Sequence, residues 1–229
     1  MSDNLHDVAL SFAEVDYSIG RKKILDRVSF KVPKGTVFAI VGHNGAGKTT
    51  LFHLLLGLKF QQSGQILLSS KSNLDYRARA GLGYVPERPY VELDITFRQH
   101  LMFHARLSGV SINEFALEVV RVANWVGLEK SLDSELSTFS KGMLQKALLA
   151  QAMLCDPNLL ILDEPMSGLD PDARNELKLK ITELKRAKKT LIFSSHALED
   201  VEQLADWVLS LHEGKVNFSG TVQEWRLSR

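Results

Sequence analysis

A phosphate-binding loop is predicted by the residue types and spacing of one short segment, Gly42-His43-Asn44-Gly45-Ala46-Gly47-Lys48-Thr49. Its glycines let the backbone curl so that peptide N–H groups converge on phosphate oxygens, where a side chain would obstruct them. Lys48 adds a positive charge for the terminal phosphates, the Thr49 hydroxyl is placed to ligate Mg²⁺, and Thr50 is expected to add one more contact. A helix that begins here would point its positive end at the same anion. The segment therefore indicates a site for the magnesium complex of a nucleotide.

Two acidic residues follow an apolar run further along the chain, Leu159-Leu160-Ile161-Leu162. A strand of this kind delivers a carboxylate at its C-terminal end, so we expect Asp163 to hold Mg²⁺ directly or through water. Glu164 comes one residue later, where it can orient or deprotonate an attacking water. An acidic pair after a strand is by itself more often a helix cap or a solvated loop. Its combination with a phosphate-binding loop favours nucleotide hydrolysis.

The order of these and further motifs resembles that of the ATP-binding-cassette (ABC) ATPases, specifically the nucleotide-binding subunits of ABC transporters, over nearly the whole chain. The resemblance implies ATP and Mg²⁺ as ligands. It implies that Tyr17 stacks on adenine and that His196, in the run Ile192-Phe193-Ser194-Ser195-His196, contacts the γ-phosphate. With Lys48 and Glu164, His196 completes the expected catalytic set.

The segment Phe139-Ser140-Lys141-Gly142-Met143 occupies the signature position of that family, and is called the signature segment below. The resemblance implies that two copies pair head to tail, so that Ser140 and Gly142 touch the γ-phosphate of the nucleotide held by the other copy. The turn Ser167-Gly168-Leu169-Asp170 matches the family's D-loop. This match implies that Asp170 connects the two active sites of such a dimer.

Two segments depart from the usual family pattern. Glu87, in Gly83-Tyr84-Val85-Pro86-Glu87, stands where many relatives have a glutamine, and we include it among the expected metal-site residues because an acid keeps an oxygen acceptor. In the signature segment, Phe139, Lys141 and Met143 replace Leu, Gly and Gln of the usual motif. This combination resembles the branch of transporter ATPases that handles drugs, antibiotic peptides, lipids, polysaccharides or sodium.

Strands and helices alternate on both sides of a helical stretch between residues 96 and 154. Strands are expected at residues 8–12, 27–32, 36–41, 65–69, 80–85, 159–162 and 190–194, with a terminal hairpin of 207–211 and 215–218. Further helices are expected from the phosphate-binding loop to residue 57, and at 172–188 and 197–204. The pattern predicts one α/β domain over residues 1–229 with a helical subdomain near 90–155. The resemblance makes this a P-loop NTPase sheet with an N-terminal antiparallel β region.

Composition excludes several classes of protein. Of the 229 residues, 45% are hydrophobic and 24% are charged, values typical of a globular protein rather than a disordered or collagen-like one. The net charge of +1 gives no reason to expect a nucleic-acid partner. A single cysteine allows no internal disulfide, no run of about 18 apolar residues occurs, and the first residues lack a signal-peptide pattern. We expect a cytoplasmic chain that is peripheral on the cytoplasmic face of the membrane.

A transporter needs a pore, so the resemblance implies separate transmembrane permease subunits, and pairing with a second copy or a homologous ATPase. Relatives receive short permease helices between about Glu87 and Leu107, where this chain has Tyr90, Phe97 and Phe103. For Phe97 and Phe103 we favour instead a place in the core of the helical subdomain. The predicted function is ATP hydrolysis that powers transport, in the direction of export.

Two other functions stay open. One is a cytosolic ABC ATPase without a permease, although this chain has neither the long coiled-coil insertion of DNA-repair relatives nor the two cassettes of translation factors. The other is an ATP-binding regulatory subunit that closes with little hydrolysis. The altered signature segment motivates that alternative, and the presence of Lys48, Asp163, Glu164 and His196 argues against it.

Overall fold

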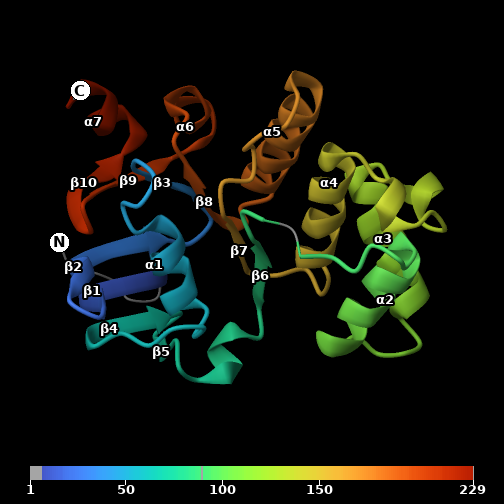
Figure 1. The fold of residues 1–229 in the computed structure, drawn as a ribbon, viewed down its shortest axis with the longest axis horizontal. Coiled ribbons are helices and arrows are strands. Elements are labelled where there is room, and N and C mark those ends of the chain that lie inside the picture. The colour runs from blue at the N-terminus through green and yellow to red at the C-terminus, as the bar shows by residue number, and fades with distance from the viewer. Residues whose placement is uncertain (1–6, 89, 229) are drawn as a thin grey trace. The chain divides into compact units, whose positions relative to one another are not determined.

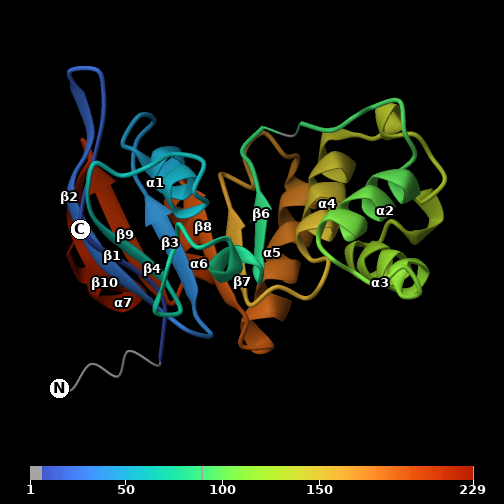
Figure 2. The same cartoon turned by 90° about the horizontal axis from the view of Figure 1, so that it is seen from below.

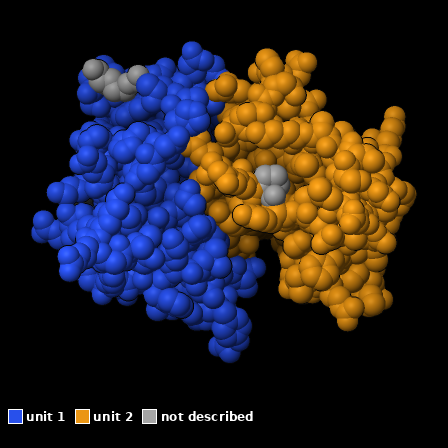
Figure 3. All heavy atoms as spheres, viewed as in Figure 1, with its two compact units in different colours: residues 1–80, 183–229 blue, residues 81–182 orange. Residues whose placement is uncertain are grey.

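The structure is a computed structural model that describes residues 7–88 and 90–228. The chain divides into two compact units, the first built from residues up to 80 and from 183 onward, the second from residues 81–182 (Figure 3). The helical subdomain expected near residues 90–155 falls within the second unit. The grouping of residues 1–229 into a single domain stays a prediction.

An antiparallel sheet in the first unit confirms the predicted N-terminal β region. Its strands are β1 (Val8–Ile19), β2 (Lys22–Pro33), β4 (Ser63–Leu68) and β5 (Lys71–Ser72), in the order β2-β1-β4-β5 (Figure 1). Both β1 and β2 are longer than the alternation of the sequence indicates. Glu14 and Arg27 have positive φ, and the β1–β2 register shifts between Phe12 and Val15. Such irregularities break the two-residue period, so the pattern ends before the strands do.

A second sheet of the first unit has β3 (Val37–Val41) between two parallel neighbours. β3 pairs with β8 (Thr190–Ser195) and β9 (Trp207–His212), and β9 forms the predicted hairpin with β10 (Lys215–Thr221). All five residues of β3 are buried, as expected for a parallel strand that is covered on both faces. The remaining elements of this unit are α1 (Lys48–Leu55), the 3₁₀ turn η2 (Tyr76–Arg79), α6 (Leu198–Leu204) and α7 (Val222–Leu227).

The second unit combines a pair of parallel strands with a group of helices. The strands are β6 (Leu82–Val85) and β7 (Leu159–Leu162). Helices α2 (Phe97–Leu107), α3 (Phe115–Val126) and α4 (Lys141–Ala152) pack against one another, as Figure 2 shows, with the short turns η3 (Glu129–Ser131) and η4 (Leu136–Thr138) between them. Helix α5 (Pro171–Arg186) begins in this unit and ends in the first. None of the helices in the described residues is long and apolar enough to cross a membrane.

The two phenylalanines of α2 have different environments. Phe97 is fully buried, with its ring against that of Phe139 at a centroid distance of 5.7 Å, which confirms its predicted place in the core. The same prediction is wrong for Phe103, whose exposed fraction is 58%. The buried positions of α2 follow Phe97 at helical spacing and include Leu101, and a residue two positions later points to the opposite side of a helix.

Candidate nucleotide-binding site

The phosphate-binding loop requires glycine at three positions, for different reasons. Gly45 and Gly47 have φ angles of 86° and 108°, in the left-handed region that residues with a side chain avoid. A Cβ atom at Gly42 would meet the carbonyl oxygen of Leu211 at 2.6 Å. One at Gly47 would meet Cδ2 of Leu25 at 2.8 Å. The loop can therefore take this shape only with the glycines that the sequence provides.

Helix α1 begins without a side-chain cap. Its N-cap residue is Gly47, and no acidic residue lies in its first turn. The first N–H groups of a helix have no partners within the helix, and the helix dipole favours negative charge at this end. Thr49 and Thr50, both half-buried, follow in the first turn. The start of α1 thus fits a phosphate group.

The charged end of the Lys48 side chain lies against this loop. Its side chain is nearly buried, with 6% exposed, and its Nζ donates hydrogen bonds to the carbonyl oxygens of Gly42 at 2.8 Å and His43 at 3.4 Å. A buried ammonium that is bonded to backbone carbonyls keeps a fixed position. The cation is therefore in place before any ligand arrives.

Residues that the sequence did not single out support the loop from outside. The N–H of Gly214, in the turn between β9 and β10, donates to the carbonyl oxygen of Ala46 at 3.2 Å, and the N–H of Asp26 donates to the carbonyl of Gly214 at 2.9 Å. A glycine between two strand-like runs predicts the turn from the sequence. Only the fold shows that this turn contacts the phosphate-binding loop.

Tyr17 lies close to the same loop. The register of β1 and β2 pairs Tyr17 with Leu25, whose side chain lies against Gly47. The ring is half-buried, and the ammonium of Lys59 lies over it. This position is compatible with the expected contact between Tyr17 and the base of a nucleotide bound at the loop.

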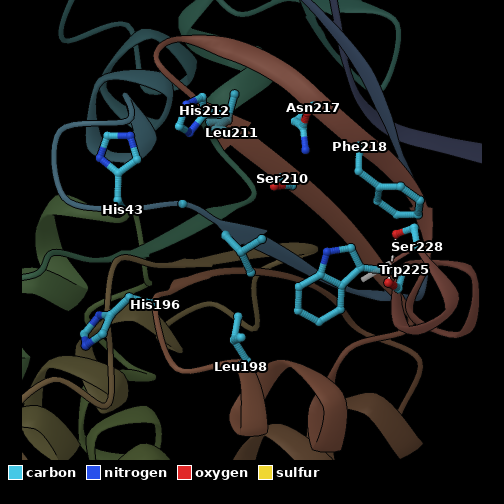
Figure 4. A pocket seen from close by; sticks show the side chains of 12 residues that line it. His43, His196, Leu198, Ser210, Leu211, His212, Asn217, Phe218, Trp225 and Ser228 are labelled. Atoms are coloured by element: carbon cyan, nitrogen blue, oxygen red, sulfur yellow. Dashed lines mark hydrogen bonds between the residues drawn. The ribbon is translucent and has the colours of Figure 1, made fainter.

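A cavity of about 650 Å³ opens beside the loop in the first unit (Figure 4). Gly42, His43 and His196, all predicted as site residues, line it, and Figure 4 shows Trp225 and Ser228 of the C-terminal segment at the other end. His196 directly follows β8 and is exposed. The structure thus brings His196, the predicted γ-phosphate contact, and the phosphate-binding loop to one cavity.

The predicted acidic residues lie at the carboxyl ends of β6 and β7 in the second unit. Asp163 is fully buried, and its N–H donates to the carbonyl of Val85 at 2.9 Å. Glu164 has a φ of 45°, in the left-handed region, which is a strained conformation of the kind found at functional sites. Burial raises the pKa of the Tyr84 phenol, and the negative charges of Asp163 and Glu87 raise it further. Both carboxylates therefore lie near that phenol.

The donor chemistry fits Mg²⁺. Thr49 in the first unit offers a hydroxyl oxygen and Asp163 in the second unit a carboxylate oxygen, and each is a hard donor of the kind that this ion takes. Among the described residues, no group of three or more His, Cys, Asp or Glu side chains is placed to hold a metal ion. Mg²⁺ needs no such cluster where phosphate oxygens and water complete its ligands.

Residues of the signature segment have structural roles at the start of α4. The hydroxyl oxygen of Ser140 accepts a hydrogen bond from the N–H of Met143 at 3.2 Å and so caps the helix. A Cβ atom at Gly142 would lie 2.9 Å from Cβ of Ala173, so glycine is needed here for packing in the absence of any ligand. Lys141 is exposed, and its ammonium lies against the D-loop glycine, Gly168.

Asp170, the last residue of the D-loop turn, caps the next helix. Its Oδ1 accepts a hydrogen bond from the N–H of Ala173 at 2.9 Å, and Pro171 takes the first position of α5. An acidic cap followed by proline is a common helix start. The predicted connection between two active sites would therefore be made by a residue that also fixes the start of α5.

Comparison with known proteins identifies the family. The model of the ABC transporter family matches residues 25–167. The uncharacterized ABC transporter ATP-binding protein YxlF of Bacillus subtilis is 37% identical over 215 residues, which are 94% of this chain and 72% of that protein. Nod factor export ATP-binding protein I of Mesorhizobium japonicum is 33% identical over 93% of this chain and 63% of its own length. The chain therefore spans somewhat less than two thirds of such a relative.

Solved structures agree with the family match. The ATP binding subunit of an ABC transporter superposes with a TM-score of 0.86 at 32% identity, covering 96% of this chain and 92% of its own. The cbiO1 protein of Clostridium perfringens, described as part of the ABC transporter complex cbiONQ, gives a TM-score of 0.87 at 28% identity, with 96% and 91% covered. These matches confirm the predicted fold class. The chain belongs to the ABC transporter family and is an ATP-binding domain of that family.

Proposed function

We propose that this chain binds and hydrolyses ATP, and that hydrolysis drives export of a substrate through separate transmembrane permease subunits. The observation that carries the proposal is the start of α1, where an uncapped helix, left-handed glycines and the buried ammonium of Lys48 form one anion site. Two similar proteins, Nod factor export ATP-binding protein I and the cbiO1 part of a transporter complex, support the direction and the permease partners. The location on the cytoplasmic face of the membrane follows from that partnership.

Each predicted residue has a role in this proposal that its chemistry supports. Thr49 and Asp163 supply oxygen ligands for Mg²⁺, and Glu87 is a further candidate. When bound, Mg²⁺ would neutralise phosphate charge and stabilise the charge that develops during transfer. Lys48 and His196 hold the terminal phosphate, and Tyr17 holds the base. The backbone of residues 42–50 surrounds the phosphates.

Glu164 is the proposed general base. Its carboxylate would accept a proton from the attacking water. Its backbone has a positive φ, and strained backbone of this kind is found at functional sites, where the surrounding packing maintains it. The residue is half-buried and directly follows the buried Asp163. Burial of the neighbouring carboxylate favours a role for Asp163 as a metal ligand and leaves the proton transfer to Glu164.

We further propose that two copies, or this chain and a homologous ATPase, bind head to tail with nucleotide between them. The Ser140 oxygen accepts the capping hydrogen bond from Met143, so the O–H of Ser140 can still donate to a phosphate. Gly142 would offer its backbone to the same phosphate.

For the permease, Tyr90 and Phe103 are candidates for contact, because their exposed fractions are 89% and 58%.

The substitution Glu164→Gln tests the catalytic assignment. It keeps the shape of the side chain and removes its basicity, so we expect phosphate release to fall about 100- to 10,000-fold while ATP affinity stays within about threefold. The two quantities are measured by a phosphate-release assay and by equilibrium titration with a fluorescent ATP analogue. Hydrolysis at the wild-type rate in this variant would contradict the assignment.

The wild-type chain separates the alternatives. ATP binding without phosphate release would favour a regulatory subunit. Hydrolysis without any membrane protein in affinity purification from detergent-solubilised membranes would favour a cytosolic ABC ATPase. We expect hydrolysis and copurification of a membrane protein.

A further inference from the structure

The half-buried Lys59 side chain contacts the predicted base-binding residue. Its Nζ lies 5.5 Å from the centroid of the Tyr17 ring. A cation over the face of an aromatic ring at less than about 6 Å is attracted by the electron density of that face. In the part of the chain that the structure describes, this ammonium forms no ion pair with a carboxylate. The ring is its partner.

The far end of α1 places Lys59. The helix ends at Leu55, and the N–H groups of Leu58 and Lys59 both donate to the carbonyl oxygen of His53, at 2.9 and 3.1 Å. Gly57, with a φ of 70°, makes the turn possible. One helix therefore presents its positive end to the phosphate-binding loop and, just beyond its other end, carries a cation to Tyr17.

The backbone beside Tyr17 is held independently. The carboxylate of Asp16 accepts hydrogen bonds from the N–H of Arg27 at 2.9 Å and from the hydroxyl of Ser63 at 2.8 Å. These bonds fix the strand to its neighbours but do not fix the direction of the Tyr17 ring. The contact with Lys59 acts on the ring itself.

We infer that Lys59 is a base-positioning residue, whose ammonium holds one face of the Tyr17 ring so that the opposite face is presented to the adenine of bound ATP. A positive charge on one face also draws electron density from the other. This lowers the repulsion between two stacked π systems and so favours the purine. The inference rests on the proposed function, namely that ATP binds at the phosphate-binding loop.

The test compares ATP with tripolyphosphate, which has the phosphates but no base. We expect Lys59→Met to weaken ATP binding about three- to tenfold, the effect of one partly desolvated cation–π contact, and to leave tripolyphosphate binding unchanged. Lys59→Arg keeps a cation and should bind ATP within about twofold of the wild-type chain. Lys71→Met, at an exposed lysine of β5, is the matched control and should change neither affinity.

A double-mutant cycle shows whether Lys59 acts through Tyr17. In a Tyr17→Ala background, Lys59→Met should have no further effect on ATP affinity. Unchanged ATP affinity in Lys59→Met would overturn the inference and leave the proposed function intact. An equal loss for ATP and tripolyphosphate, or a loss that persists in Tyr17→Ala, would also overturn it, since Lys59 would then act on the phosphates or the fold. If the wild-type chain binds neither compound, the proposed function fails and this inference fails with it.

Discussion

The start of α1 has no side-chain cap, whereas the start of α4 is capped by its own serine. Both helix starts are predicted to face phosphate. At α1 no side chain caps the first turn, and Leu25 and Gly214 contact the loop from outside. At α4 the hydroxyl oxygen of Ser140 already occupies the N–H of Met143. The first start therefore fits the proposed phosphate site with groups of one chain, while the second offers fewer groups because its own serine already uses one N–H.

The lysines at the starts of α1 and α4 also differ, in how far each is buried and held in place. Lys48 is nearly buried and bonded to loop carbonyls, so its position is set in advance. Lys141 is exposed, in the first position of α4, where a positive charge opposes the helix dipole. No acidic residue in the first turn of α4 offsets that charge. A preorganised cation contributes more to binding than a solvated one, because less ordering is needed when the ligand arrives.

The pair Lys48→Ala and Lys141→Ala tests this comparison most strongly. Loss of a charge-assisted contact should weaken ATP binding to the isolated chain about 100-fold for Lys48→Ala, and Lys141→Ala should change it by less than about twofold. Equilibrium titration with a fluorescent ATP analogue gives both values, and circular dichroism checks that each variant is folded. Similar losses in the two variants would mean that the start of α4 binds nucleotide without a partner.

The packing beneath the two helices also differs. Helix α1 buries aliphatic and aromatic residues, while α4 ends at a polar contact in which Nε2 of the buried His100 meets Oε1 of Gln151 at 2.9 Å. Only 3% of His100 is exposed. Its burial, together with the neighbouring His104, lowers its pKa to about 4, against the opposing effect of the hydrogen bond that its ring donates to Gln151. His100 is therefore neutral in the folded protein at physiological pH.

Acid should destabilise the second unit through this histidine. The pKa is about 4 in the folded chain and 6.5 in the unfolded one, so unfolding takes up a proton between these values. Above about pH 7 the neutral, buried His100 makes its full contribution to the free energy of unfolding. That contribution falls as the pH drops below 6.5, and at pH 5 the free energy of unfolding is lower by about 2 kcal/mol. Denaturant unfolding at pH 7.5 and pH 5 measures it. In His100→Gln the fall between the two pH values should be smaller by about that amount, and an equal fall in both proteins would assign the acid sensitivity elsewhere.

The phosphate-binding loop could be predicted in full because its requirements are local. Three glycines, a lysine and a threonine within eight residues carry the whole pattern, and the buried strand before them is visible as an apolar run. Its supports could not be predicted. Leu25 and Gly214 are far from the loop in sequence, and they reach it only through strand pairing and a hairpin turn.

Side-chain environments were harder to predict than elements. The prediction of a core position is confirmed for Phe97 and wrong for Phe103, because an aromatic side chain on a helix is buried only where the helical period turns it toward the core. The contact of Lys59 with Tyr17 had no sequence signal, since a single lysine after a helix is an ordinary surface residue. The register shift within β1 likewise hid the strand that carries Tyr17.

The smallest expected effect separates the two roles of Ser140. Ser140→Ala removes the cap of α4 and should lower the free energy of unfolding by about 1 kcal/mol, with unchanged ATP affinity in the isolated chain. Ser140→Asp restores a good cap and should recover that stability, but its negative charge would repel the phosphate of a nucleotide held by a second copy. Stability from denaturant unfolding and turnover from phosphate release should therefore diverge in Ser140→Asp. Wild-type turnover in this variant would mean that Ser140 only caps α4. The start of α4 would then be a structural feature and not half of a shared phosphate site.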